Sequence, residues 1–276
     1  MSDFLATMAA ASRARVHAAL AACPLDAMAA RARNSPPPPP LVLSPGRFDI
    51  IAEMKLRSPA AGALRAASAD DIAARVRDYA RAGAAAVSVL TEPSRFDGAL
   101  EHLAQAAHAL APARVPAMRK DFLVDPYQVM EARVAGAGGV LVILRMLPRT
   151  DIEALLAAAA SLELFALLEA FDEADIELAH ELARHAGGRL LVGLNCRDLA
   201  TLQVVPGRLE ALAPRLPAHL PRVAESGLDS AQDAARIAAA GYDLALVGSA
   251  LMKRDAPGTL LADMLAAGRA ARGSVP

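Results

Sequence analysis

The sequence lacks features that several classes of protein require. It has no tryptophan and only 3% aromatic residues, and its two cysteines, Cys23 and Cys196, are too few for a disulfide framework and show no C-x-x-C spacing. Such sparse cysteine is typical of a reducing compartment, so we expect a cytoplasmic protein. The six histidines include no H-x-x-x-H pair, which argues against a zinc site, and we expect no metal.

The charge balance and the short apolar runs exclude two more classes. The formal net charge is −1, without a basic block or a stripe of basic and aromatic residues, so we expect no nucleic-acid partner. The longest apolar run, residues 134–144, is rich in glycine and falls short of the roughly 18 residues that span a membrane. The first residues lack a basic start followed by an apolar core and a cleavage site, so we predict neither a signal peptide nor a membrane partner.

What the chain does contain is mainly aliphatic. Of its 276 residues, 55% are hydrophobic and 21% are charged, a composition typical of helices packed around a buried parallel sheet. Residues 2–33 predict one or two helices broken at Pro24, and the tract SPPPPP at 35–40 stops any helix and holds the chain extended. We therefore predict a helical extension with a proline-rich linker over residues 1–46 and a separate main domain over residues 47–276.

In the main domain, short β-branched apolar runs alternate with longer helical patterns, several of which carry capping residues at their ends. The predicted strands are Phe48–Met54, Ala86–Leu90, Val115–Met118, Gly139–Leu144, Leu164–Glu169, Leu190–Asn195, Arg222–Ser226 and Leu244–Gly248. Eight strand–helix units without hairpin signals predict an α/β fold in which the strands close into a (β/α)8 TIM barrel. The alternative is an open doubly wound sheet, but the nearest glycine-rich motif, GAGG at 136–139, precedes a strand instead of following one.

Polar residues fall at the ends of the predicted strands, where barrels of this kind build their active sites. The first strand ends in Glu53 and Lys55, and later strand ends carry Arg119, Lys120, Asp121, Glu169, Asn195, Arg197, Asp198, Glu225, Ser226, Gly248 and Ser249. Charged groups from separate strands would crowd one mouth, which costs solvation unless they hold a ligand. The pattern therefore predicts a binding or catalytic site at that mouth.

The last two loops indicate the chemistry of the ligand. The segments ESGLDSAQD and VGSALM each place Gly and Ser directly after a strand and before a helix. Glycine lets backbone N–H groups approach closely, and loops after strands seven and eight form the phosphate site of many barrels. We infer a phosphorylated small-molecule substrate; ordinary barrel turns built from small residues are the alternative.

Motifs along most of the chain resemble the indole-3-glycerol phosphate synthase family. The segments that carry the resemblance are IAEMKLRSPAAG, AVSVLTEPSRFDGALEHL, PAMRKDFLVDPYQVMEARVAGAGGVLVIL, LLEAFDEADIE, VGLNCRDLATLQV, RVAESGL and LALVGSALM. The resemblance implies a (β/α)8 barrel with an N-terminal helical cover. It also implies conversion of 1-(2-carboxyphenylamino)-1-deoxyribulose 5-phosphate to indole-3-glycerol phosphate in tryptophan biosynthesis, with release of CO2 and water and without a cofactor.

The same resemblance implies roles for individual residues. Lys120 would be the general acid for ring closure and Glu169 the general base for dehydration, while Lys55, paired with Glu53, would hold the substrate carboxylate and supply a later proton. Residues implied to position the ring and the ribulose hydroxyls are Asn195, Arg197 and Glu225. Residues implied to surround the phosphate are Ser58, Ser226, Gly227, Gly248 and Ser249. Residues implied to line the slot for the aromatic ring are Phe122 and Leu144.

Three positions depart from the family pattern. Ala60 stands in SPA where SPS is usual, Cys196 replaces a second Asn or Ser, and Phe171 stands where His or Asn is common. None touches the implied acid and base, but affinity and substrate identity could change. No histidine is close in sequence to Cys196, so we interpret Cys196 as a small buried neighbour and not as a nucleophile.

Two other functions fit parts of the pattern. Phosphoribosylanthranilate isomerase is a related barrel, but its pattern places a cysteine at the end of the first strand, where this chain has Glu53 and Lys55. A non-catalytic barrel that binds a phosphorylated metabolite is the other alternative, although binding alone does not require both Lys120 and Glu169. No large apolar stripe demands a partner chain, so we expect a monomer.

Overall fold

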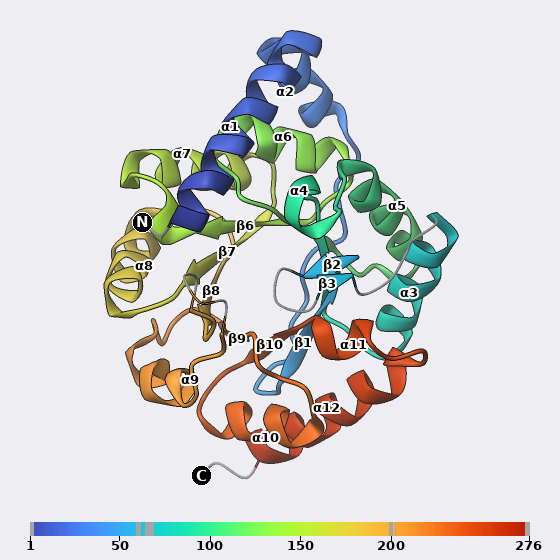
Figure 1. Ribbon diagram of the computed structural model, residues 1–276, viewed down its shortest axis with the longest axis vertical. Coiled ribbons are helices and arrows are strands. Elements are labelled where there is room, and N and C mark those ends of the chain that lie inside the picture. The colour runs from blue at the N-terminus through green and yellow to red at the C-terminus, as the bar shows by residue number, and fades with distance from the viewer. Residues whose placement is uncertain (1–2, 59–61, 64–68, 199–200, 202, 274–276) are drawn as a thin grey trace.

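A closed parallel barrel forms the body of the protein (Figure 1). The computed structural model describes residues 3–58, 62–63, 69–198, 201 and 203–273. Within this part of the chain, eight parallel strands close in the order β1-β10-β9-β8-β7-β6-β5-β4. Their bounds are β1 Asp49–Met54, β4 Ala86–Leu90, β5 Ala117–Lys120, β6 Gly139–Ile143, β7 Phe165–Ala170, β8 Leu190–Asn195, β9 Arg222–Glu225 and β10 Leu244–Val247. The predicted (β/α)8 barrel is confirmed, and the open sheet is wrong.

The strands form where the sequence predicts them because they are buried on both faces. Every residue of β1, β4, β6, β7 and β10 is buried, which explains continuous apolar runs without polar alternation. The third strand begins two residues later than predicted, at Ala117. Pro116 has no N–H to donate, so it contributes only its carbonyl, which accepts from Val87 N. Arg119 and Lys120 are therefore residues of the strand itself.

Helices follow the strands and form the outer layer (Figure 1). Their bounds are α3 Ala69–Arg81, α5 Leu100–Leu110, α6 Pro126–Val134, α7 Arg149–Ser161, α8 Glu173–His185, α9 Arg208–Leu212, α10 Ala231–Ala239 and α12 Pro257–Arg272. Capping is local: Asp125 accepts from Tyr127 N before α6, and Ser230 and Asp233 form a capping box at α10. These caps are the signals that made the helix starts predictable.

Short elements that the sequence did not predict lie after the strands. They are the helices α4 Pro93–Phe96 and α11 Ser249–Met252 and the antiparallel pair β2 Arg57–Ser58 and β3 Gly62–Ala63. The short 3-10 helices are Ala111–Ala113, Leu144–Met146 and Ala213–Arg215. At α4, Glu92 accepts hydrogen bonds from Ser94 N and Arg95 N, which fixes the loop after β4. The pieces that follow strands shape the end of the barrel at which those strands finish, whereas Ala111–Ala113 and Ala213–Arg215 extend α5 and α9.

The N-terminal extension is two helices, α1 Asp3–Ala22 and α2 Leu25–Asn34, which break at Pro24 as predicted. Figure 1 shows both in blue, with α1 running past α6, whose Tyr127 donates a hydrogen bond to the Ala19 carbonyl. Leu5, Met8 and Ala9 of α1 are buried in the same hydrophobic core as the barrel. Burying these side chains gives the extension a large part of its docking free energy.

The proline tract connects α2 to the barrel in extended conformation. Arg133 of α6 donates hydrogen bonds to the carbonyls of Ser35 and Pro36. Leu41 is buried, and its carbonyl accepts a hydrogen bond from Arg189. The tract is thus attached to the barrel at several points. The division into residues 1–46 and 47–276 stays a prediction, since α1 shares its core with the barrel.

A close approach between α12 and β1 yields a stability prediction. A methyl group at Gly268 of α12 would lie 2.2 Å from the ring of the fully buried Phe48. We expect Gly268→Ala to lower the free energy of unfolding by about 1–3 kcal/mol, because the ring cannot move without disturbing the core. The matched control is Gly258→Ala in the same helix, where the nearest atom is at 3.6 Å. Urea unfolding that ranked the two variants equally would contradict this packing.

Candidate active site

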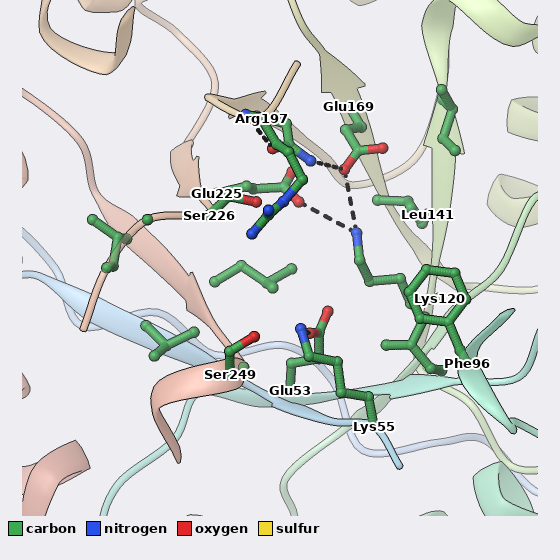
Figure 2. A pocket seen from close by; sticks show the side chains of 18 of the residues that line it. Glu53, Lys55, Phe96, Lys120, Leu141, Glu169, Arg197, Glu225, Ser226 and Ser249 are labelled. Carbon is green, nitrogen blue, oxygen red and sulfur yellow. Dashed lines mark hydrogen bonds and ion pairs between the residues drawn. The ribbon is translucent and has the colours of Figure 1, made fainter. Parts of the chain in front are cut away.

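A cavity of about 290 Å³ opens at the carboxyl ends of the barrel strands (Figure 2). The predicted site residues that line it are Glu53, Lys55, Lys120, Phe122, Glu169, Asn195, Arg197, Glu225, Ser226, Gly227, Gly248 and Ser249. They come from β1, β5, β7, β8 and β9 and from the loops that follow the strands. The structure therefore brings together nearly all of the side chains that the sequence singled out.

Lys120 lies between two glutamates from other strands. Its Nζ is 3.2 Å from Oε1 of Glu169 and 3.4 Å from Oε2 of Glu225. Figure 2 shows these contacts as dashed lines that converge on the ammonium group. Burial favours the neutral amine, but the two carboxylates outweigh it and raise the pKa of Lys120. The side chain is therefore held as an ammonium in a closed space.

A second ion pair faces Lys120 from β1. Lys55 Nζ is 2.6 Å from Oε1 of Glu53, and both side chains point into the cavity (Figure 2). Burial alone would raise the pKa of Glu53, but the ammonium groups of Lys55 and Lys120 hold it below its ordinary value. The two residues share a side of the extended chain because they are two positions apart. The site thus contains two ammonium groups, each paired with a carboxylate.

Glycines on neighbouring strands make room for the buried carboxylates. A methyl group at Gly193 of β8 would lie 2.1 Å from Oε1 of Glu225, and one at Gly248 would lie 2.2 Å from Oε1 of Glu53. Both contacts are far below van der Waals distance, so a methyl group at either position would displace the carboxylate beside it. Gly248 therefore has a steric role in addition to the phosphate role that the family resemblance implies.

Glu225 is the least compensated charge in the cavity. It is buried, and its Oε1 has no hydrogen-bond partner. Burial raises its pKa well above the ordinary range, the carboxylate of Glu169 adds to the shift through charge and a side-chain hydrogen bond, and Lys120 opposes it. Two carboxylates this close share protons as a pair.

Asn195 and Arg197 occupy the end of β8 and the residues after it. Asn195 Nδ2 donates to Oε1 of Glu169 at 3.0 Å, and its Oδ1 accepts from Arg197 N at 3.0 Å. Figure 2 shows the Arg197 side chain extending into the cavity close to Glu225. Asn195 thus orients Glu169, and Arg197 brings a positive charge into the cavity that also helps to lower the pKa of Glu53.

The loops after β9 and β10 have unusual backbone conformations. Ser226 and Gly227 both have positive φ, 72° and 68°, a combination that a serine adopts at some cost. Cys196 Sγ donates to the carbonyl of Ser226 at 3.2 Å, which helps to hold this conformation. Burial raises the pKa of the Cys196 thiol, and this supports its interpretation as a neutral packing residue. Ser249 begins α11 directly after Gly248.

The apolar wall of the cavity differs in part from the prediction. Phe122 lines it and packs edge-on against Phe4 of α1, with ring centroids 5.8 Å apart. Leu144 does not line the described cavity; Leu141 and Ile143 of β6 do. Leu144 begins the 3-10 helix Leu144–Met146 after β6, and its side chain is buried away from the cavity.

Of Ser58, Ala60 and Phe171, which the sequence singled out, only Phe171 has a described side chain. The backbone of Ser58 ends β2, but its side chain lies outside the described part of the chain, and so does Ala60. Phe171 lines the cavity, and the Arg145 guanidinium stacks 4.8 Å from its ring centroid. Arg145 is in turn paired with Asp175. Phe171, which stands where the family commonly has His or Asn, is thus held by contacts of its own.

Sequence reasoning missed several residues of the cavity. Phe4 and Leu5 come from α1, Phe96 ends α4, and Lys253 follows α11 at the exposed rim. Nothing in the sequence indicates which face of α1 meets the barrel, so Phe4 and Leu5 could not be predicted as cavity residues. Strand parity could have selected Leu141 and Ile143.

Two kinds of feature are absent from the described residues. No group of three or more His, Cys, Asp or Glu side chains in this part of the chain is arranged to hold a metal ion. No helix in the same residues has the length and apolar character that crossing a membrane requires.

Comparisons with known proteins agree on one family. Residues 5–263 match the family model described as indole-3-glycerol phosphate synthase. A curated protein of that name from Mycolicibacterium smegmatis is 39% identical over 259 residues, which cover 93% of this chain and 91% of the relative. Another, from Parafrankia sp., is 43% identical over 227 residues, which cover 82% and 81%.

Solved structures show the fold alone. The 3-hexulose-6-phosphate synthase of Salmonella typhimurium superposes with a TM-score of 0.62 at 14% identity, covering 80% of this chain and 98% of that one. The thiamine phosphate pyrophosphorylase of Pyrococcus furiosus gives a TM-score of 0.58 at 15% identity, covering 81% and 96%. These identities are too low to carry an argument about activity.

The packing of Glu225 against Gly193 predicts an activity loss. We expect Gly193→Ala to push the Glu225 carboxylate away from Lys120 and to lower kcat by roughly 10- to 100-fold, since small displacements in active sites have effects of this size. Gly187→Ala, just before β8 and with no atom within 4 Å, is the control. Steady-state kinetics of the two variants make the comparison, and equal kcat values would refute the steric argument.

The raised pKa of Glu225 predicts a pH-dependent effect on stability. A carboxyl group whose pKa is higher in the folded state costs nothing below its unfolded pKa and destabilises increasingly as the pH rises toward its folded pKa. We expect Glu225→Gln to be more stable than wild type at alkaline pH. The difference should grow with pH by at most about 1.4 kcal/mol per unit.

Urea unfolding between pH 5 and pH 9 measures that difference. Glu101→Gln, on the exposed face of α5, is the control and should show no such trend. A stability difference for Glu225→Gln that is flat or that falls with pH would mean that Glu225 is ionised in the folded protein.

Proposed function

The chain belongs to the indole-3-glycerol phosphate synthase family, and from this premise we propose that Lys120, held between Glu169 and Glu225, is the general acid of its reaction. The protein closes and decarboxylates 1-(2-carboxyphenylamino)-1-deoxyribulose 5-phosphate and dehydrates the product to indole-3-glycerol phosphate, a step of tryptophan biosynthesis. It is a carboxy-lyase. Neither the isomerase nor the regulatory barrel explains a family match over residues 5–263.

The reaction requires several proton transfers. The carboxylated ring carbon attacks the ketone carbon of the ribulose chain, and the ketone oxygen takes up a proton as the new bond forms. The C–C bond to the carboxylate then breaks, CO2 leaves, and the electron pair returns to the ring. Finally, the hydroxyl leaves as water after protonation, and a ring proton is removed. An acid is therefore needed at two steps and a base at the last.

Lys120 suits the first of these steps. The neighbouring carboxylates keep it protonated in the empty site, which is the state required before closure. Its position, with Nζ within 3.5 Å of two carboxylate oxygens, is the observation that carries the assignment. An ammonium fixed in this way stabilises the negative charge that develops on the ketone oxygen.

Glu169 suits the role of base in the dehydration. Its Oε1 already accepts hydrogen bonds from Lys120 and Asn195, which fix its orientation. Lys55, oriented by Glu53 at 2.6 Å, would bind the substrate carboxylate and supply the proton for loss of the hydroxyl. Each step thus has a separate group, and the two lysines do not compete for one partner.

The remaining residues would bind the ends of the substrate. Ser226, Gly227, Gly248 and Ser249 line one side of the cavity, and their backbone N–H groups support the proposed phosphate site. Arg197 adds a positive charge near Glu225, and Phe122 with Phe96 offers an aromatic wall for the ring. We retain two further proposals from the sequence, a monomeric protein and a cytoplasmic location.

The assignment of acid and base predicts separable kinetic defects. Lys120→Met should lower kcat by at least about 100-fold, while substrate binding stays largely intact. Glu169→Gln should slow dehydration and let the ring-closed intermediate accumulate. Indole fluorescence follows turnover, and single-turnover quench experiments reveal the intermediate.

Two variants serve as controls for these changes. Lys253→Met removes an ammonium at the exposed rim, outside the carboxylate pair, and should retain kcat even if KM changes. Glu173→Gln removes an exposed carboxylate close to Glu169 in sequence. Lys120→Met with wild-type turnover would reject the proposed acid, and Glu169→Gln without an accumulating intermediate would reject the proposed base.

A further inference from the structure

A buried polar network lies outside β5, behind Lys120. Strand alternation sends Lys120 into the cavity and Arg119 to the opposite side. Asp121, the residue after β5, touches the cavity, but its carboxylate turns toward Arg15 of α1. The Asp121 carboxylate is fully buried, with 0% of its side chain exposed. The groups that bind this carboxylate therefore affect the positions of Lys120 and Phe122, the residues on either side of Asp121.

Four donors surround the Asp121 carboxylate. Oδ1 is 2.6 Å from Arg15 Nη2 and accepts from Phe122 N at 2.8 Å. Oδ2 accepts from Thr91 Oγ1 at 2.7 Å and from Arg119 Nη2 at 3.2 Å. Three of these donors belong to the barrel wall. Arg15 alone among the four belongs to the N-terminal helix.

The same network contacts Lys120 through its backbone. Thr91 N donates to the Lys120 carbonyl at 3.1 Å, while Thr91 Oγ1 donates to Asp121. Phe122, whose N–H binds Asp121, places its ring in the cavity wall. The pose of Asp121 is therefore linked to the backbone of residues 120–122, which carries both the proposed acid and part of the ring slot.

Arg15 supplies one of the two positive charges in this region. The buried carboxylate of Glu92 lies 3.7 Å from Arg15 Nη1, and Glu131 is paired with Arg119 at 3.0 Å. Two guanidinium groups thus face three carboxylates. Without Arg15, Asp121 would keep only the guanidinium of Arg119, which also serves Glu131, and Glu92 would lose its ion pair. A buried carboxylate that loses its cation must turn toward water or take up a proton.

We propose that Arg15 is a positioning residue for Lys120: through Asp121, the N-terminal helix fixes the strand end that presents the general acid to the substrate. This inference rests on the proposed function of Lys120. It assigns α1 a part in the chemistry that differs from covering the core, because it depends on one guanidinium and not on the buried apolar face of the helix.

A set of matched variants separates the two roles of α1. Arg15→Met keeps the aliphatic stem and removes the charge, and Arg15→Lys keeps a charge that can reach Asp121. Val16→Ala loosens the helix without touching Asp121, since Val16 packs against Met28 and Tyr127. Arg13→Met removes an exposed arginine from the same helix.

We expect Arg15→Met to lower kcat by roughly 10- to 100-fold with little change in KM, because substrate still binds but the acid is displaced. Single-turnover kinetics should show slower ring closure and unaltered dehydration. Arg15→Lys should recover part of the rate. Val16→Ala and Arg13→Met should keep kcat within about twofold of wild type, and thermal unfolding records how far each variant is destabilised.

The variant Asp121→Asn provides a second test, whose result does not depend on how well Arg15→Met folds. The amide needs no counter-charge, so Arg15→Met should have little further effect on kcat in the Asp121→Asn background, and the double-mutant cycle should show strong coupling. Additive effects would overturn the inference. So would an unchanged kcat in Arg15→Met, or an equal kcat loss in Val16→Ala at equal destabilisation.

These outcomes are distinguishable from failure of the proposed function. If the wild-type protein forms no indole product, or if Lys120→Met keeps full turnover, then the proposed general acid is wrong and this inference is wrong with it. If the wild type is active and Lys120→Met is inactive, but Arg15→Met is fully active, then only this inference is wrong.

Discussion

The structure depends on one electrostatic arrangement, an ammonium group held between two buried carboxylates. Lys120 reaches Glu169 and Glu225 from across the barrel, and these contacts keep it charged in a space that would otherwise favour the neutral amine. The pKa of Glu225 is raised for the complementary reason, because burial and a neighbouring carboxylate both oppose its ionisation. The cavity therefore shifts the pKa values of its acidic and basic groups away from their ordinary values, as a reaction with several proton transfers requires.

The backbone makes that arrangement possible in two ways. Strands that run parallel bring their carboxyl ends to one rim, and alternation sends Lys120 inward while its neighbour Arg119 faces outward. Glycine at 193 and 248 leaves the volume that the glutamates occupy. A barrel interior packed with larger side chains would exclude the carboxylates, so these glycines contribute to the chemistry by being small.

The N-terminal helix joins the two sides of β5. Its apolar residues complete the core and part of the cavity wall, and Arg15 supplies a positive charge to the buried Asp121 carboxylate behind the strand end. The N-terminal helix is therefore coupled to the strand end that carries the proposed general acid. This coupling explains how a segment that precedes the first strand can influence a lysine more than 100 positions later in the chain.

The sequence by itself determined the barrel, the order of its elements and most of the residues at its mouth, because parallel strands buried on both faces leave continuous apolar runs and polar residues mark their ends. Only the tertiary structure decided that Lys120 has two carboxylate partners, that Leu144 does not line the cavity, that Phe4 does, and that Arg15 contacts Asp121. Local periodicity records which face of an element is apolar. It does not record which distant element meets that face, since such contacts join residues that have no fixed spacing along the chain.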